Sequence, residues 1–166
     1  GSAMTLRAAI ITASDSGWAG TREDLSTPAA RAMLEEAGYL VTRCLLLPDD
    51  RAMLSAAIAE LCDSDAADLI LTTGGTGFSP RDCTPEATAD VIERPVPGIP
   101  EALRAHSMRI TPRAMLSRAT AGIRKGTLIV NLPGSPRAVS ESLSFLLPGL
   151  AHGLEVLRGN ARDCGR

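Results

Sequence analysis

Four short apolar runs recur along the chain, separated by stretches in which apolar residues return every three or four positions. The runs cover residues 6–12, 39–47, 69–73 and 127–132. Runs of this length without regularly spaced polar positions are typical of strands buried on both faces of a parallel sheet. We therefore predict four strands, of which those over residues 6–12 and 127–132 are predicted to be buried.

Helix signals lie between these runs. Thr27 followed by Pro28 is typical of an N-cap and a first helical residue, and apolar residues at helical spacing follow. The same pair of signals at Thr84 and Pro85 predicts a helix that continues to about Glu93. Between these two helices, apolar positions at helical spacing over residues 54–61 predict a third.

The C-terminal half carries many prolines. Residues 94–100 contain three of them and are predicted to form an irregular connection. Short helices are predicted from Pro100 and from Pro112. After a turn at residues 133–136, a further helix is predicted to be interrupted at Pro148, and a last helix to run to about Arg158.

Strands that alternate with helices imply right-handed crossovers between parallel strands. The predicted fold class is therefore α/β, a three-layer sandwich with a mostly parallel sheet and helices on both faces. A chain of 166 residues can bury one sizeable core, and no shift in composition marks a second domain, so we expect one domain over residues 4–166. Gly1–Ala3 before Met4 resemble the remnant of an expression tag.

Composition narrows the function classes. Seventeen basic and nineteen acidic side chains give a formal net charge of −2, and only 2% of residues are aromatic. This balance disfavours nucleic acid as a partner, whether held by a basic clamp or by base stacking. No apolar run approaches the ~20 residues of a membrane span, so no membrane partner is expected.

The spacing of the four cysteines indicates the redox state of the cellular compartment. They are widely spaced, without a metal-binding pair or a disulfide framework, which favours reduced thiols in the cytoplasm. They are Cys44, Cys62, Cys83 and Cys164.

The loop Gly74-Gly75-Thr76-Gly77 directly follows a predicted strand. Three glycines in four residues allow backbone N–H groups to approach an anion, so the loop predicts phosphate binding. The alternative is a tight turn without a ligand. The pattern matches neither a P-loop nor a dinucleotide-binding fingerprint.

Aspartates follow several of the predicted strands. Asp49 and Asp82 are candidate ligands of Mg²⁺, which prefers carboxylate oxygens beside phosphates. Asp50 is better explained as the N-cap of the next helix. Asp82 has the alternative role of a turn residue or a partner of Arg81. Asp15 lies in the loop after the first strand, at the edge of the sheet where ligands bind.

The segment that follows the last predicted strand has similar potential. Asn131 is either a ligand-binding amide or a partner of local backbone groups, and the backbone at Pro133 and Gly134 can approach a ligand closely. Ser135 is a predicted N-cap at a helix N-terminus, which also attracts anions. Basic residues scattered over positions 104–125 either attract an anionic substrate or form a solvated face.

Four ordered motifs together resemble the molybdopterin adenylyltransferase family of molybdenum cofactor biosynthesis, over nearly all of residues 6–157. The motifs are Thr-Thr-Gly-Gly-Thr-Gly at 72–77, Arg-Asp-Cys-Thr-Pro-Glu-Ala-Thr at 81–88, Met-Leu-Ser-Arg at 115–118 and Asn-Leu-Pro-Gly at 131–134. The resemblance implies that ATP and molybdopterin are substrates, that adenylyl-molybdopterin and pyrophosphate are products, and that Mg²⁺ is required.

The resemblance also implies site residues and partners. Asp49 and Asp82 are the catalytic and Mg²⁺-binding aspartates. The ligand pocket carries over to Asp15, Gly74, Gly75, Thr76, Gly77, Ser117 and Asn131, with the adjoining turn Pro133, Gly134 and Ser135. Homotrimers, or hexamers built from them, are expected, and a molybdenum insertase is the expected partner for the next step.

Two other functions fit the same residues. One is a molybdopterin-binding module without adenylyl transfer, and the other is a nucleotide pyrophosphatase-like domain. A purely structural trimer leaves the glycine loop and the aspartates unexplained. The first loop departs from the family pattern, since Ser14-Asp15-Ser16 stands where many members have Ser-Asp-Arg.

Overall fold

A six-stranded sheet forms the middle layer of the structure, a computed structural model that describes residues 4–159. The strand order is β2-β1-β3-β6-β5-β4, and the first four strands are parallel, whereas β5 and β4 are antiparallel to their neighbours. The mostly parallel sheet is thus confirmed. The strands are β1 (Arg7–Ala13), β2 (Leu40–Leu47), β3 (Leu69–Thr73), β4 (Arg94–Pro95), β5 (Ala121–Arg124) and β6 (Thr127–Leu132).

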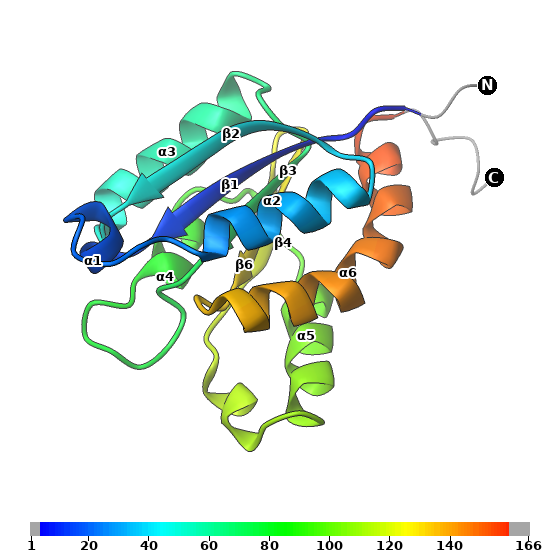
Figure 1. Cartoon of the computed structure of the whole chain (residues 1–166). Coiled ribbons are helices and arrows are strands. Elements are labelled where there is room, and N and C mark those ends of the chain that lie inside the picture. The colour runs from blue at the N-terminus through cyan, green and yellow to red at the C-terminus, as the bar shows by residue number, and fades with distance from the viewer. Residues whose placement is uncertain (1–3, 160–166) are drawn as a thin grey trace.

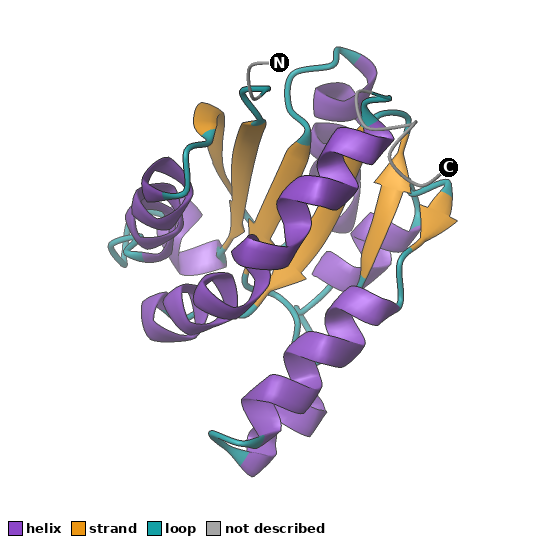
Figure 2. Cartoon of the chain, turned by 90° about the vertical axis from the view of Figure 1, so that its right-hand side faces the viewer, coloured by secondary structure: helices purple, strands orange, loops and turns teal. Residues whose placement is uncertain are grey.

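Helices cover both faces of this sheet, as predicted (Figures 1 and 2). Alternate residues of β1 point to opposite faces: Ile10 packs with α2, α5 and α6, whereas Ile11 packs with α3 and α4. The helices are α1 (Asp15–Trp18), α2 (Ser26–Glu36), α3 (Arg51–Asp63), α4 (Thr84–Ala89), α5 (Gly98–Met108) and α6 (Pro136–Leu157), with a 3₁₀ helix η1 (Pro112–Leu116). Among residues 4–159, no helix has both the length and the apolar character needed to cross a membrane.

The predicted starts of two helices are too late, by two residues for α2 and by one residue for α4. α2 begins at Ser26, because the Asp24 carboxylate accepts hydrogen bonds from the backbone N–H groups of Ser26 and Thr27. Asp24 therefore has the capping role that was predicted for Thr27. α4 begins at Thr84, so the preceding Cys83 is its N-cap and the Thr84 hydroxyl caps nothing. This helix also ends at Ala89, four residues before the predicted end.

The proline-rich predictions are also corrected. Residues 94–100 are partly regular, because Glu93 and Val96 donate backbone hydrogen bonds to β5 on either side of β4, and α5 starts at Gly98. α6 runs through Pro148 without interruption, and its leucines remain buried on both sides of the proline. Packing therefore outweighs the hydrogen bond that proline removes. The tag-like residues 1–3 and Cys164 lie outside the described residues.

Candidate active site

Four loops meet at the edge where the parallel strands end. Two backbone hydrogen bonds join them: Ser14 N–H donates to the Leu47 carbonyl at 2.9 Å, and Gly74 N–H donates to the Leu132 carbonyl at 3.1 Å. In open α/β sheets this edge is where ligands bind. Asp15 is the first residue of the short helix α1, which follows β1 directly, and the other predicted residues of this edge lie in the loops. They are Asp49, Gly74, Gly75, Thr76, Gly77, Pro133, Gly134 and Ser135.

The glycine loop needs its first two glycines for steric reasons. Gly74 has φ +88°, and a Cβ there would lie 2.5 Å from the Ala13 carbonyl oxygen. A Cβ on Gly134 would lie 3.2 Å from Gly74 Cα, so these two loops touch through their backbones. Gly75 has φ +71°. Both positive angles lie in the region that glycine adopts at little cost.

The backbone amides of this loop divide into two pairs. Gly74 N–H is taken by Leu132, and Gly77 N–H donates to Asp82 Oδ2 at 3.1 Å. Within residues 4–159, the hydrogen bonds of the fold use neither Gly75 N–H nor Thr76 N–H. A phosphate at this loop would therefore meet two amides, fewer than the four residues of the motif suggest.

Two reciprocal hydrogen bonds join Asp15 and Asp49. Asp49 N–H donates to Asp15 Oδ1 at 2.9 Å, and Asp15 N–H donates to Asp49 Oδ2 at 3.1 Å. The Arg81 guanidinium adds two hydrogen bonds to the Asp15 carboxylate, both 2.9 Å long, and these lower the pKa of Asp15. Arg81 thus pairs with Asp15, so the alternative in which it pairs with Asp82 is wrong.

The other carboxylate oxygen of Asp49, Oδ1, has different surroundings from Oδ2. Asp49 Oδ1 is buried and finds no hydrogen-bond partner among the described residues. Burial raises the pKa of Asp49, and the nearby charges of Asp15 and Asp82 raise it further, against the opposing hydrogen bond from Asp15. An ionised carboxylate in this setting favours a cation beside it.

Asp82 closes its own loop and keeps one oxygen uncommitted. Its Oδ2 accepts hydrogen bonds from Gly77 N–H and Ser79 N–H, each at 3.1 Å, which is the predicted role of a turn residue. Among residues 4–159 no group of three or more His, Cys, Asp or Glu side chains is arranged for a metal. A cation here would therefore have two carboxylates at most, a number that suits Mg²⁺ when phosphates supply other ligands.

Three further predictions have clear structural outcomes. Asp50 Oδ1 accepts from Met53 N–H at 2.9 Å and caps α3, and Ser135 Oγ accepts from Ala138 N–H at 3.1 Å and caps α6, both as predicted. The Asn131 side chain is buried and bonded within the fold, which favours its structural alternative. Its amide contacts Thr120 N–H and the hydroxyls of Thr72 and Thr88.

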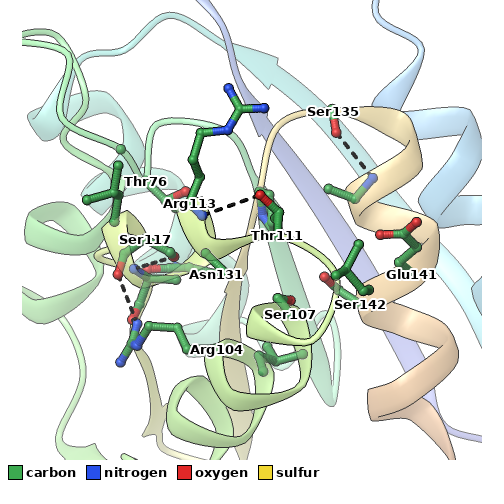
Figure 3. A pocket seen from close by; sticks show the side chains of 18 of the residues that line it. Thr76, Arg104, Ser107, Thr111, Arg113, Ser117, Asn131, Ser135, Glu141 and Ser142 are labelled. Carbon is green, nitrogen blue, oxygen red and sulfur yellow. Dashed lines mark hydrogen bonds between the residues drawn. The ribbon is translucent and has the colours of Figure 1, made fainter.

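A cavity of about 560 Å³ opens beside the glycine loop (Figure 3). Ser117 lies in its wall, where the Ser117 carbonyl accepts from Arg104 at 3.2 Å and the hydroxyl accepts from Ala119 N–H at 3.2 Å. The cavity gathers six predicted residues. They are Thr76, Gly77, Ser117, Asn131, Pro133 and Ser135.

A second cavity of about 290 Å³ is lined by the start of the loop. Ser14, Asp24, Gly74 and Gly134 line it, and Ser135 lines both cavities. Gly75 and the three aspartates Asp15, Asp49 and Asp82 are not among the lining residues of either cavity. The predicted residues are thus split between two adjacent cavities and a carboxylate cluster next to them.

Arg118 is the residue that the sequence did not single out. Its Nε donates to the Gly77 carbonyl at 2.7 Å and its Nη2 to the Asp82 carbonyl at 2.9 Å, while Nη1 pairs with Glu86 at 2.5 Å. Its backbone N–H also donates to the Thr76 carbonyl at 2.8 Å. Only its place after Leu-Ser in a motif separated it from the other scattered arginines.

Comparison with known proteins identifies the family of the chain. The family described as "Probable molybdopterin binding domain" matches residues 9–152. The molybdopterin adenylyltransferase of Helicobacter pylori J99 is 38% identical over 161 residues, covering 95% of this chain and 90% of the relative. The crystal structure of the molybdopterin biosynthesis enzyme MoaB from Thermus thermophilus superposes with a TM-score of 0.88 at 44% identity, covering 93% of this chain and 98% of that one.

A longer relative contains the same unit. The molybdenum cofactor biosynthesis bifunctional protein of Synechococcus elongatus is 42% identical over 152 residues. The match covers 92% of this chain and 47% of that protein, so the unit makes up about half of it.

Proposed function

Because the chain belongs to the family of molybdopterin-binding domains of molybdenum cofactor biosynthesis, we propose that it is an enzyme that transfers the adenylyl group of ATP to molybdopterin. The products are adenylyl-molybdopterin and pyrophosphate. The observation that carries this proposal is the position of Asp49 and Asp82 beside a glycine loop that lines two cavities.

Two cavities that meet at one loop suit a reaction of two phosphate-bearing substrates. Gly74 lines the smaller cavity, Thr76 and Gly77 line the larger one, and Ser135 belongs to both. A substrate in each cavity would direct its phosphates toward the loop, where the amides of Gly75 and Thr76 can donate to them. This brings the reacting groups together, which supplies a large part of the rate enhancement of a two-substrate reaction.

Adenylyl transfer requires that the two substrates be positioned and that the charge of their phosphates be neutralised. An oxygen of the terminal phosphate of molybdopterin attacks the α-phosphorus of ATP. The bond from that phosphorus to the bridging oxygen breaks, and pyrophosphate leaves with the electron pair. The attacking phosphate is ionised at neutral pH, so no side chain needs to remove a proton. The aspartates therefore act as holders of a cation.

The residues present fit Mg²⁺. Asp49 Oδ1 is a buried oxygen without a partner, and Asp82 keeps one carboxylate oxygen outside the hydrogen bonds of its loop. Hard cations prefer such oxygens. When bound, Mg²⁺ would neutralise charge on the phosphates. Asp15, neutralised by Arg81, fixes Asp49 through the reciprocal hydrogen bonds.

The test measures pyrophosphate release from ATP and Mg²⁺, with and without molybdopterin, in the wild type and in Asp82→Asn. Asp90→Asn, which breaks an exposed ion pair with Arg51, is the matched control. We expect molybdopterin-dependent release that is lost only in Asp82→Asn. Molybdopterin binding without pyrophosphate would support a binding module instead. Release that needs no molybdopterin would support a nucleotide pyrophosphatase.

We further propose a homotrimer, or a hexamer of two trimers, in the cytoplasm, with a molybdenum insertase as the partner that receives the product. The match to about half of a bifunctional protein of the same biosynthesis supports a second activity close to this one. Sedimentation velocity tests the oligomer, and a single species at the 17.3 kDa of the monomer would contradict it.

A further inference from the structure

Two buried oxygens without partners face the turn at Gly75. Within residues 4–159, the side-chain atoms Thr84 Oγ1 and Asp49 Oδ1 are both buried and unpaired. A Cβ built on Gly75 would lie 2.4 Å from Thr84 Oγ1 and 3.0 Å from Asp49 Oδ1. The two oxygens therefore line one small space, which exists because residue 75 has no side chain.

The Thr84 hydroxyl has no structural task that would explain its position. Thr84 is fully buried at the start of α4, yet its side chain does not cap the helix. The hydroxyls of the other fully buried threonines, Thr72, Thr73, Thr88 and Thr127, do have partners. Thr127 Oγ1, for example, donates to the Ala67 carbonyl at 2.8 Å. Leaving a buried hydroxyl unpaired is destabilising, so a group that pairs with it in the working enzyme is expected.

The surroundings specify the chemistry of that group. Asp49 Oδ1 belongs to an acidic cluster with Asp15 and Asp82, and Arg81, the counter-charge beside the cluster, is bonded to Asp15. Another hydrogen-bond acceptor would leave Asp49 unpaired. A hard divalent cation satisfies a carboxylate oxygen and a hydroxyl oxygen at once, as in P-loop proteins, where a Ser or Thr hydroxyl binds Mg²⁺.

We propose that Thr84 Oγ1 is a third protein ligand of the divalent cation, beside Asp49 and Asp82. The inference rests on the proposed function for the presence of Mg²⁺ and deepens it by adding a ligand from α4. It also gives Gly75 a second purpose, since any side chain there would occupy the space between two of the ligands.

The test measures binding of Mn²⁺, as a paramagnetic substitute for Mg²⁺, by electron paramagnetic resonance. Titrations are made without nucleotide and with an ATP analogue that carries a methylene group between the α- and β-phosphorus atoms. The variants are Thr84→Val, which keeps the shape and removes the hydroxyl, and Thr84→Ser, which keeps the hydroxyl. Thr127→Val is the matched control, because it removes a buried hydroxyl far from the site.

We expect Thr84→Val to weaken Mn²⁺ binding by about tenfold or more, and Thr84→Ser and Thr127→Val to stay near the wild type. The rise in melting temperature on adding Mn²⁺ should shrink in parallel, since that rise depends on affinity. Wild-type affinity in Thr84→Val would overturn the proposal. Asp49→Asn distinguishes a failure of the Thr84 proposal from a failure of the proposed metal site. If Asp49→Asn loses Mn²⁺ binding while Thr84→Val retains it, only the role of Thr84 fails. If Asp49→Asn also retains Mn²⁺, the metal assignment of the proposed function fails.

Discussion

Asp15 and Asp49 each donate a backbone N–H to the carboxylate of the other, at 3.1 and 2.9 Å respectively. This exchange joins the loop after β1 to the loop after β2 and fixes the orientation of both carboxylates. It occupies Asp49 Oδ2 and leaves Oδ1 on the side of Gly75. Since Asp15 is also bonded to Arg81, we infer that it acts through Asp49 as a positioning residue.

Asp49→Asn should stabilise the protein while it removes activity. Burial raises the pKa of Asp49 above its value in the unfolded chain, so the stability of the folded state falls as the pH rises through the folded pKa. Asparagine removes that cost and still accepts the hydrogen bond of Asp15. We expect the free energy of unfolding to rise by about 1 kcal/mol at neutral pH.

Urea denaturation across the acidic and neutral range measures this effect. The difference between Asp49→Asn and the wild type should vanish at pH values below the unfolded pKa, where Asp49 is protonated in both states. A variant that is less stable than the wild type at neutral pH would show that the ionised carboxylate stabilises the fold.

Gly75→Ala should disrupt both folding and catalysis. The substitution places a Cβ in a backbone conformation with φ +71° and within 2.4 Å of Thr84 Oγ1. We expect a loss of about 1–3 kcal/mol and of adenylyl transfer. Gly149→Ala is the matched control, because Gly149 lies within α6 with open space around it, and it should gain about 0.5–1 kcal/mol. Melting curves of the two variants that move in the same direction would contradict this.

Arg118→Lys should lower turnover more than stability. One guanidinium holds the carbonyls of Gly77 and Asp82 together, and the single ammonium group of lysine cannot reproduce that fork. A small displacement of the glycine loop at residues 74–77 relative to Asp82 is expected to reduce kcat by about 100-fold. Arg51→Lys, at an exposed bidentate pair with Asp90, is the control and should leave kcat unchanged. Equal losses of kcat in both variants would exclude the positioning role.

The sequence predicts a strand most reliably where the residues of the strand form a continuous apolar run. The cores of β1, β3 and β6 are continuous apolar runs, so their presence and their parallel arrangement follow from the pattern. β4 has only two residues and exists because it pairs with β5, a contact between distant segments that no local pattern encodes.

The residues of the candidate site likewise fall into those that the sequence pattern predicts and those that it does not. Aspartates after successive parallel strands must gather at one edge, which is why Asp49 could be selected beforehand. The contacts of Arg118 with Gly77 and the unpaired hydroxyl of Thr84 depend on side-chain geometry across more than one loop. Sequence spacing carries no information on such geometry, so these roles of the two residues emerge only from the structure.

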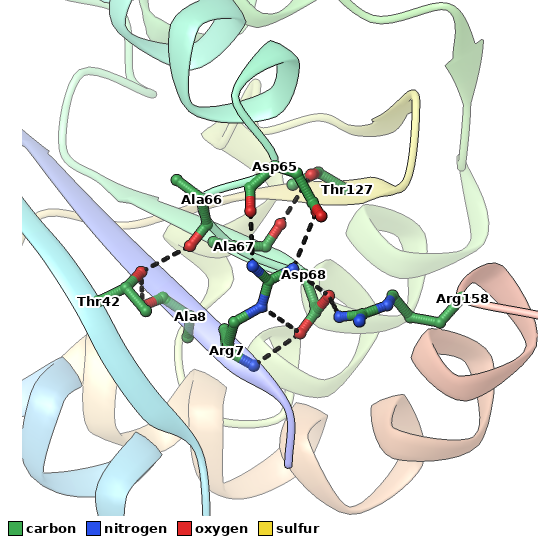
Figure 4. Close-up of polar contacts among 9 residues, drawn as sticks. All are labelled: Arg7, Ala8, Thr42, Asp65, Ala66, Ala67, Asp68, Thr127 and Arg158. Atoms are coloured by element: carbon green, nitrogen blue, oxygen red, sulfur yellow. Dashed lines mark hydrogen bonds and ion pairs between the residues drawn. The ribbon is translucent and has the colours of Figure 1, made fainter. Parts of the chain in front are cut away.

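Asp68→Asn should destabilise the protein in a pH-dependent way without affecting catalysis. Asp68 lies at the opposite end of the sheet, with 1% of its side chain exposed, between the guanidinium groups of Arg7 and Arg158 (Figure 4). Burial alone would raise the pKa of Asp68, but the hydrogen bonds from the Arg7 side chain and backbone and from Arg158 outweigh it and lower the pKa.

A lowered pKa contributes stability that is present above the unfolded pKa and is lost as the pH falls through the folded pKa. We expect Asp68→Asn to cost about 2 kcal/mol at neutral pH, measured by urea denaturation, and the gap to the wild type to narrow in acid. Asp63→Asn, which breaks the more exposed pair with Arg124, should destabilise the protein much less than Asp68→Asn, because solvent screens this pair. A gap that stays constant from neutral to acidic pH would show that Asp68 stabilises the strand ends through its shape and neutral hydrogen bonds, with no contribution from its charge.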